Sequence, residues 1–338
     1  MIHKFSQYNN VRQFWLFCDN IITENYSKII FQNRGGKINC KSYYPTLLEA
    51  VSGSYFLYDH PVLSNIDGVK LFQVQDGYGL EAILSDRYLC IKRHEEEFDL
   101  KTFSIFENEN KLIESEYLPI NNVFLSLGYI FFNHINHENL LSCYSISTAK
   151  GIWQQNFDEI LSTKGVSIYT NRLQVIGNKL FLFAHDSNWE KYATFCLDAD
   201  TGEVLKRIEM GVYLYAHENM IYTIGDQSLT LLDPKTYEME TINLADQLQN
   251  LVLDDMKCYF YKDKLYFAAK PDENTAFSVV GILDLKSSQL QDSFELLIDP
   301  SKPSEHENRY WIQEIKANDH LLAVHTSGGD LHVFEIRE

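Results

Sequence analysis

The sequence predicts an all-β protein: a β-propeller of seven or eight four-stranded antiparallel blades, formed by residues 1–338 as a single domain. Three observations predict it. The chain contains 21 Tyr and 21 Phe but only 7 Pro, which favours sheet. Dense apolar strands recur along it, and a turn-forming run follows most of them at a nearly constant distance. Repetition at a fixed period is typical of propellers and solenoids.

Each recurring strand follows a polar or glycine turn, as in "SDRYLCI", "SLGYIFF", "GNKLFLF", "HENMIYTI", "KDKLYFAA" and "NDHLLAV". We anchor these strands at Tyr88, Tyr129, Leu180, Ile221, Leu265 and Leu321. The turn-forming runs lie 19, 18, 18, 12 and 19 residues beyond the first five anchors, at index positions Glu107, Ser147, Asp198, Asp233 and Asp284. We expect each anchor strand to be second in its blade and each index run to join the third strand to the fourth.

The N-terminal part adds anchors at Phe14, 19 residues before "NRGGK", and at Tyr55. The eight anchors then average about 44 residues apart, the length expected of a four-stranded blade. Tyr55 and Tyr88 are only 33 residues apart, so seven blades stay open as an alternative to eight. "LHVFEIRE" ends one strand short, and "HKFSQYN" is expected to supply that strand and close the last blade.

One hairpin carries a specific resemblance. "LDADTGEVL" resembles the repeat of quinoprotein-like (pyrroloquinoline-quinone-type) β-propellers, in which an Asp, a Thr-Gly turn and a following Trp recur. Lys206 holds the place of that Trp after Gly202, and Trp153 in "TAKGIW" comes two residues early relative to its index position. The resemblance implies a propeller fold and, as one alternative, quinone-dependent chemistry with calcium.

Charge narrows the classes of partner. Asp and Glu number 47 against 29 Lys and Arg, which gives a formal net charge of -18. Such a field repels nucleic acids and anionic membranes and attracts basic proteins, although acidity also serves solubility alone. We expect a protein partner with a basic patch, no nucleic acid and no membrane.

The cysteines and the N-terminal residues indicate a reduced, cytoplasmic protein. Six Cys occur without any C-x-x-C pair, mostly within apolar runs, so we expect buried thiols. "MIHKFSQYNNVRQFWLFCDN" does not read as a secretory signal, and no segment approaches the ~20 apolar residues of a membrane span.

The loops between second and third strands vary in length, and variable loops on a rigid scaffold commonly bind partners. They supply the candidate protein-binding residues: Glu95, Glu96, Glu97, Asp99, Asp186, Trp189, Glu190, Tyr192, Asp272 and Glu273. The acidic residues suit a basic partner, with a solvated charge run as the alternative. Trp189 and Tyr192 suit interface anchors, with packing against a neighbouring loop as the alternative.

Two further motifs match the residue pattern of known sites but lack the secondary structure that those sites require. His134 and His137 have the spacing of metal ligands on a helix, but their surroundings indicate strand and loop. "DGYGLEA" matches the dinucleotide fingerprint, but the strand "RYLCIK" follows too soon for the helix that this fingerprint requires. We therefore expect no metal site and no cofactor.

The sequence thus favours a non-enzymatic interaction protein. A narrower hypothesis is an immunity-type inhibitor that binds and neutralises a cognate toxin. The alternative is a propeller enzyme, quinoprotein-like or sugar-active, that holds its ligand in a central channel. A scaffold in a membrane-assembly complex is disfavoured by the missing export signal.

Overall fold

The structure, a computed structural model, describes the chain apart from residues 1, 9–10, 18–19, 26–27, 34–37, 43–45, 50–54, 60–61, 66–69, 85–86, 98–99, 108, 127, 170–171, 272–276, 297–310 and 337–338. In the strands before Lys70, side chains are described at 7–8, 13–16, 21–24 and 62–63. The chain divides into two compact units. Unit 1 contains residues 1–44 and 217–338, and unit 2 contains residues 45–216.

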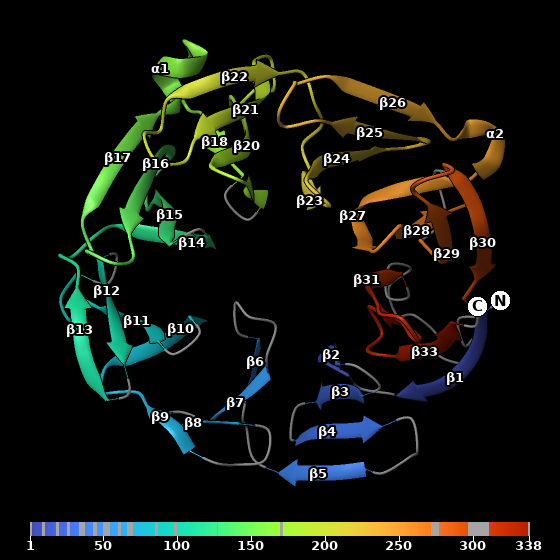
Figure 1. The fold of residues 1–338 in the computed structure, drawn as a ribbon, viewed down its shortest axis with the longest axis horizontal. Helices are drawn as coiled ribbons and strands as arrows, with labels where there is room; N and C mark the ends of the chain where they lie inside the picture. Colours follow the sequence, from blue (N-terminus) through green and yellow to red (C-terminus); the bar gives the residue numbers. More distant parts are fainter. Residues whose placement is uncertain are drawn as a thin grey trace. The chain divides into compact units, whose positions relative to one another are not determined.

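Unit 2 contains four antiparallel sheets, each in chain order (Figure 1). The first is β6 (Thr46–Glu49), β7 (Tyr55–Asp59), β8 (Val62–Asn65) and β9 (Lys70–Gln73). The second is β10 (Tyr78–Leu84), β11 (Arg87–Arg93), β12 (Lys101–Glu107) and β13 (Asn110–Glu114). The third is β14 (Ile120–Ser126), β15 (Tyr129–His134), β16 (His137–Ser145) and β17 (Gly151–Asn156), followed by α1 (Phe157–Leu161). The fourth is β18 (Ser167–Ile168), β20 (Lys179–His185), β21 (Tyr192–Asp198) and β22 (Val204–Ile208), with β19 (Gln174–Ile176) also pairing with β20.

Unit 1 also contains four sheets. The chain begins in unit 1 and returns to it within β23. The first is β2 (Gln13–Phe17), β3 (Asn20–Asn25), β4 (Lys28–Asn33) and β5 (Ile38–Ser42). The next is β23 (Tyr215–His217), β24 (Met220–Gly225), β25 (Ser228–Leu232) and β26 (Met239–Asn243), followed by α2 (Ala245–Leu248). The third is β27 (Val252–Tyr261), β28 (Lys264–Lys270), β29 (Val279–Asp284) and β30 (Gln289–Glu295). The fourth is β31 (Ile312–Ala317), β32 (Leu321–Thr326), β33 (Leu331–Ile336) and β1 (Ile2–Tyr8).

The last of these sheets joins the two ends of the chain. β1 pairs antiparallel with β33, with Ile2 opposite Ile336 and Tyr8 opposite Leu331, so the ends of the chain lie side by side (Figure 1). A few residues after β1, Val11 N donates to the Gly329 carbonyl at 2.7 Å. Val11, Phe14 and Ile21 then pack on Leu321 and Val333 in one buried cluster.

The repeat predicted from the sequence corresponds to this strand order, with one exception. Seven of the eight anchors lie on second strands, and all five index runs lie between third and fourth strands. The prediction for Phe14 is wrong: it lies on β2, the first strand of its sheet, rather than on a second strand. The reason is that the preceding strand, β1, belongs to the sheet of β33.

Among the described side chains, burial follows strand position within the sheets. Second strands and most third strands are mainly buried, as in β20, where every residue after Lys179 is buried. Fourth strands are mostly exposed, as in β13. In unit 2 the core therefore lies between neighbouring sheets: Phe131 and Leu141 of one sheet pack on Leu182 and Phe195 of the next. Each such fully buried side chain stabilises the fold by roughly 1.5–3 kcal/mol.

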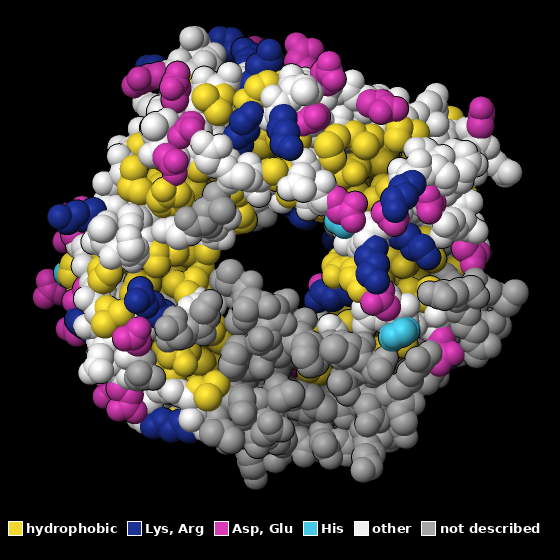
Figure 2. All heavy atoms as spheres, viewed as in Figure 1, with side chains coloured by type: hydrophobic (Ala, Val, Ile, Leu, Met, Phe, Trp, Pro, Cys, Tyr) yellow, Lys and Arg dark blue, Asp and Glu magenta, His cyan; other side chains and the backbone are white. Residues whose placement is uncertain are grey.

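The surface shows the same arrangement. In Figure 2, apolar side chains gather between neighbouring sheets from β14 to β22. Around α1 and β22, Asp and Glu lie mixed with Lys and Arg rather than forming a patch of one sign. No helix among the described residues is long and apolar enough to cross a membrane.

The β21–β22 and β29–β30 hairpins, each between a third and a fourth strand, share one turn. Asp198 Oδ1 accepts from Asp200 N and Thr201 N, and Gly202 closes the turn with φ +74°. Asp284 accepts in the same way from Lys286 N and Ser287 N, and Ser288 takes φ +55°. An Asp side chain favours such a turn because it hydrogen-bonds the backbone just ahead of it.

The register of the third sheet corrects one index position. Ala149 N donates to the Ser145 carbonyl at 2.9 Å, as Gly202 N donates to that of Asp198, so the equivalent residue is Ser145 rather than Ser147. Trp153 pairs with Cys143 where Lys206 pairs with Cys196. Trp153 therefore occupies the same place as Lys206 and is not early.

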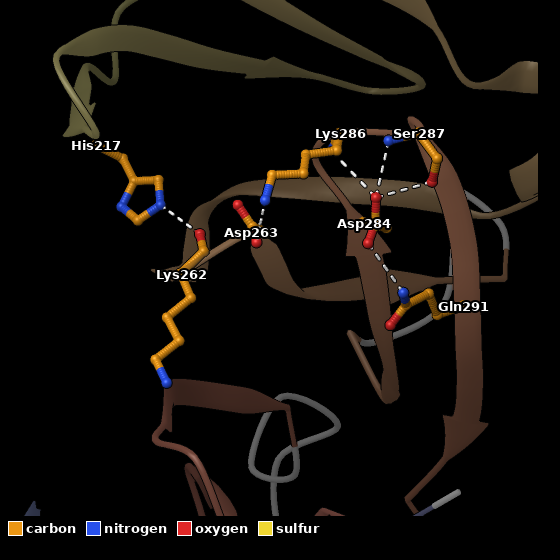
Figure 3. Close-up of polar contacts among 7 residues, drawn as sticks. All are labelled: His217, Lys262, Asp263, Asp284, Lys286, Ser287 and Gln291. Atoms are coloured by element: carbon orange, nitrogen blue, oxygen red, sulfur yellow. Dashed lines mark hydrogen bonds and ion pairs between the residues drawn. The ribbon is translucent and has the colours of Figure 1, made fainter. Parts of the chain in front are cut away.

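In unit 1, polar contacts join turns within one sheet and between neighbouring sheets (Figure 3). His217 Nε2 donates to the Lys262 carbonyl at 2.5 Å, and Lys286 pairs with Asp263 at 2.6 Å. The Lys262 ammonium pairs with Asp319, in the turn between β31 and β32. Three successive sheets are thus linked through their turns.

Candidate functional site: a polar groove in unit 2

In an antiparallel sheet, the loop from the second strand to the third lies at the same end of the strands as the start of the first strand. In unit 2 this end of the sheets carries the β11–β12, β15–β16 and β20–β21 connections and the starts of β10, β14 and β18. The candidate site is a groove at these strand ends, formed by two adjoining cavities.

The larger cavity, of about 700 Å³, lies between the β10–β13 and β14–β17 sheets. Its charged and amide-bearing residues are Glu81 of β10, Arg93 and Lys101 at the facing ends of β11 and β12, and Asn121 and Asn122 of β14. Gly77, with φ +83°, turns the chain into β10 at its edge. "DGYGLEA" therefore forms a turn and a strand.

A β-bulge places the two amides in the cavity. The register between β14 and β15 shifts between Ile120 and Val123, so Asn121 and Asn122 fall outside the regular pairing. The buried Asn133 side chain accepts from Asn122 N at 3.1 Å and replaces the missing ladder bond. Bulges commonly redirect side chains in this way.

The smaller cavity, of about 330 Å³, shares Asn121 and Asn122 with the first. Its far wall is formed by Ser167, Tyr169 and His185. Ser167 Oγ donates to Glu138 Oε2 at 2.7 Å, which joins the start of β16 to β18. The groove thus crosses three successive sheets of one unit.

Aromatic rings gather at the β20–β21 end of the groove. The ring of His185 stacks on that of Trp189, with centroids 3.8 Å apart and planes at 15°. Tyr169 contacts both rings edge-on or tilted. Trp189 and Tyr192 remain 44% and 54% exposed, which leaves broad apolar surface beside a polar groove.

Electrostatics distinguish the larger cavity from the acidic chain around it. Arg93 and Lys101 are directly opposite each other in the pairing of β11 and β12. Surrounding protein removes water from the Glu81 carboxyl and raises its pKa, and the charge of Lys101 lowers that pKa in part. Two cations and one carboxylate therefore line this cavity.

Nine of the ten predicted residues fall into three groups. Glu95, Glu96 and Glu97 lie exposed in the β11–β12 connection, between the cavity residues Arg93 and Lys101 in sequence. Trp189, Glu190 and Tyr192 are exposed at the β20–β21 connection. Asp99, Asp272 and Glu273 lie outside the described residues.

Asp186 has a different environment from the other predicted acids. It is only 5% exposed, and its Oδ1 accepts from Glu190 N at 2.9 Å. Its own N–H donates to the Lys191 carbonyl, and Trp189 takes φ +60° in the same turn. Asp186 therefore shapes the turn that presents Trp189.

His134 and His137 bound the tight β15–β16 turn. His134 Nε2 hydrogen-bonds with Ser142 Oγ at 2.7 Å and with Gln154 Nε2 at 3.0 Å. Burial and the neighbouring His137 lower the pKa of His134. Among the described residues, no group of three or more His, Cys, Asp or Glu side chains is placed to hold a metal ion.

Sequence reasoning missed most of the groove: Glu81, Arg93, Lys101, Asn121, Asn122, Tyr169 and His185. The available signal was position, since most of these residues lie at or near the start of a first or third strand or at the end of a second strand. That rule needs strand boundaries accurate to one residue.

The chain is similar to solved structures across its whole length. A computationally designed protein named Ika8 is 11% identical over 98% of both chains, with a TM-score of 0.62. BamB from Moraxella catarrhalis is 12% identical over 99% of this chain and 100% of its own, with a TM-score of 0.57. Sqt1 from Saccharomyces cerevisiae is 9% identical over 99% of both, with a TM-score of 0.56.

BamB and Sqt1 are β-propellers. The fold is that of a β-propeller. No protein-family model and no curated sequence matches the chain. The resemblance to the quinone-type repeat therefore finds support at the level of the fold and not of the family.

Proposed function

We propose that this chain is a non-enzymatic propeller that binds another protein through the groove of unit 2 and the loops beside it. The observation that carries the proposal is the pair of exposed rings, Trp189 and Tyr192, at the end of a polar groove. Large aromatic side chains supply much of the binding energy at protein interfaces. They are presented by a connection between rigid strands, where binding residues commonly lie.

The test is affinity purification from native lysate followed by mass spectrometry. The wild-type chain is expected to retain a stoichiometric protein partner, and Trp189→Ala with Tyr192→Ala is expected to lose it. Leu112→Ala is the matched control, because Leu112 is 43% exposed but lies on the fourth strand β13. Equal recovery by the double variant and the wild type would contradict the proposal.

The narrower form of this proposal concerns the kind of partner. Glu95, Glu96 and Glu97 and the net charge of -18 suit a partner with a basic patch. We propose a toxin that the chain neutralises as an immunity-type inhibitor. Expression beside the neighbouring reading frames tests this: rescue of growth from a toxic neighbour supports it, and a non-toxic partner rejects it.

The second candidate is a sugar-active or quinone-dependent propeller enzyme. The observation in its favour is the raised pKa of Glu81 in a cavity of about 700 Å³, since such carboxyls can act in acid–base chemistry. Thermal melting with pyrroloquinoline quinone plus calcium, or with a panel of oligosaccharides, separates the candidates. A ligand that binds the native state raises the melting temperature.

For the architecture, we propose that the eight sheets are eight blades of a single propeller. The number of sheets supports this proposal, because each unit contributes four sheets within the described strands. An electron-microscopy class average with seven-fold or two-lobed features would reject it.

A further inference from the structure

The larger cavity contains an unfavourable arrangement of charge. Arg93 and Lys101 are cross-strand partners, so both side chains project from the same face of the sheet. Like charges directly opposite each other destabilise an antiparallel pair. Both residues also line the cavity, so an anion bound there would lie beside both charges.

The described residues compensate this charge in part. Glu81 lies close enough to Lys101 for an electrostatic interaction. Arg93 has no ion pair with any residue that the structure describes, although Arg12 and Arg87 both have one. One positive charge therefore remains in the cavity.

The neighbouring groups suit an anion held by a polypeptide. Asn121 and Asn122 bring amides from the β14 bulge to the opposite wall. An amide both donates and accepts, which matches the C=O and N–H of a peptide backbone, whereas a guanidinium matches a carboxylate. An acidic residue within a peptide presents both groups, a backbone amide and a side-chain carboxylate.

The loop above the cavity carries the opposite charge. His94 Nδ1 accepts from Glu96 N at 3.3 Å and from Glu97 N at 3.0 Å, which folds the acidic run back over the end of β11. The His94 ring also packs edge-on against Tyr117. The basic residues Arg93 and Lys101 therefore flank the connection that carries the acidic residues Glu95, Glu96 and Glu97.

We propose that this cavity binds the carboxylate of an Asp or Glu side chain in the protein partner, and that basic residues flanking it face Glu95, Glu96 and Glu97. The inference rests on the proposed protein-binding function and defines which segment the partner inserts. A short acidic residue between two basic ones is the predicted recognition element.

The test uses trifluoroacetyl-Lys-Asp-Lys-amide and its Asn counterpart as probes, with binding followed by fluorine NMR. The two peptides differ only in the central charge. We expect the Asp peptide to bind the wild-type chain about tenfold more tightly than the Asn peptide, because a charge-assisted hydrogen bond is lost. Arg93→Gln is expected to abolish this difference.

Arg87→Gln is the matched control, since Arg87 lies at the other end of β11 and pairs with Glu107. It is expected to bind both peptides as the wild type does. Equal binding of the two peptides, no binding of either, or an unchanged preference in Arg93→Gln would overturn the cavity assignment. Those results would leave the Trp189 purification result intact, so the two failures are distinguishable.

Discussion

Gly202 lies directly against Trp153 of the preceding sheet. A Cβ added to Gly202 would lie 2.6 Å from Trp153 Cδ2. Trp153 Nε1 donates to the Ala199 carbonyl at 2.9 Å, and Gln155 donates to that of Gly202. A fourth strand is thus docked onto the third-to-fourth turn of the next sheet in the same unit.

This contact predicts that Gly202→Ala destabilises the protein through steric overlap as well as backbone strain. Gly128→Ala is the control, because Gly128 has φ +82° and a Cβ added there would meet nothing within 4 Å. We expect Gly202→Ala to lose about 1–3 kcal/mol more than Gly128→Ala in urea unfolding. Equal losses would show that the indole moves away without cost.

The equivalent turn in unit 1 predicts a stabilising change. Ser288 takes φ +55°, a conformation that costs a non-glycine residue roughly 1 kcal/mol. Ser288→Gly is therefore expected to raise the urea midpoint. Ser287→Gly should lower it, because Ser287 Oγ donates to Asp284 at 2.8 Å. Shifts of the same sign in both variants would contradict this turn geometry.

A buried histidine predicts a loss of stability in acid. Burial lowers the pKa of His325 below 6.5, although its hydrogen bond to the Val11 carbonyl and the charges of Glu314 and Asp330 oppose the shift. The unfolded chain therefore binds the proton more readily, so stability is full above about pH 6.5 and falls as the pH drops below it.

His325→Gln retains a donor for Val11 but does not titrate. We expect its urea midpoint to fall less between pH 7.5 and 5.5 than that of the wild type. His134 also has a lowered pKa, so some dependence should remain until His134→Gln is added. Parallel pH profiles for wild type and His325→Gln would exclude His325 as the cause.

The pairing of β1 with β33 predicts that deleting residues 1–10 is costly. The deletion exposes one edge of β33 and removes Tyr8 from the cluster around Leu331. We expect the melting temperature to fall by at least about 5 °C. An unchanged melt would mean that this strand adds nothing to the stability of its sheet.

The strand rhythm could be predicted from the sequence because it depends on local patterns. Asp198 and Gly202 specify their turn within five residues, and buried strands such as β20 read as apolar runs. Phe14 was misplaced because the strand before it pairs with β33, more than three hundred positions away, and not with β2. That pairing was expected from "HKFSQYN", and it makes β2 the first strand of its sheet.

The groove was harder to predict because it depends on register. Asn121 and Asn122 reach the cavity through an irregularity in β14, and Arg93 meets Lys101 only across a strand pair. Trp189 and Tyr192 were found because aromatic residues within a polar loop stand out in the sequence. Asp186 was grouped with the exposed acidic residues. The residue type alone does not reveal that its carboxylate accepts a hydrogen bond from the backbone of its own turn.

The two units differ in when they can be completed during synthesis. Unit 2 is one continuous stretch, so its four sheets can form as soon as residue 216 has left the ribosome. Unit 1 must hold β1 unpaired until the residues of β33 emerge. A nascent chain therefore carries β1 without its sheet partner for most of its translation, and an unpaired strand can pair with other chains.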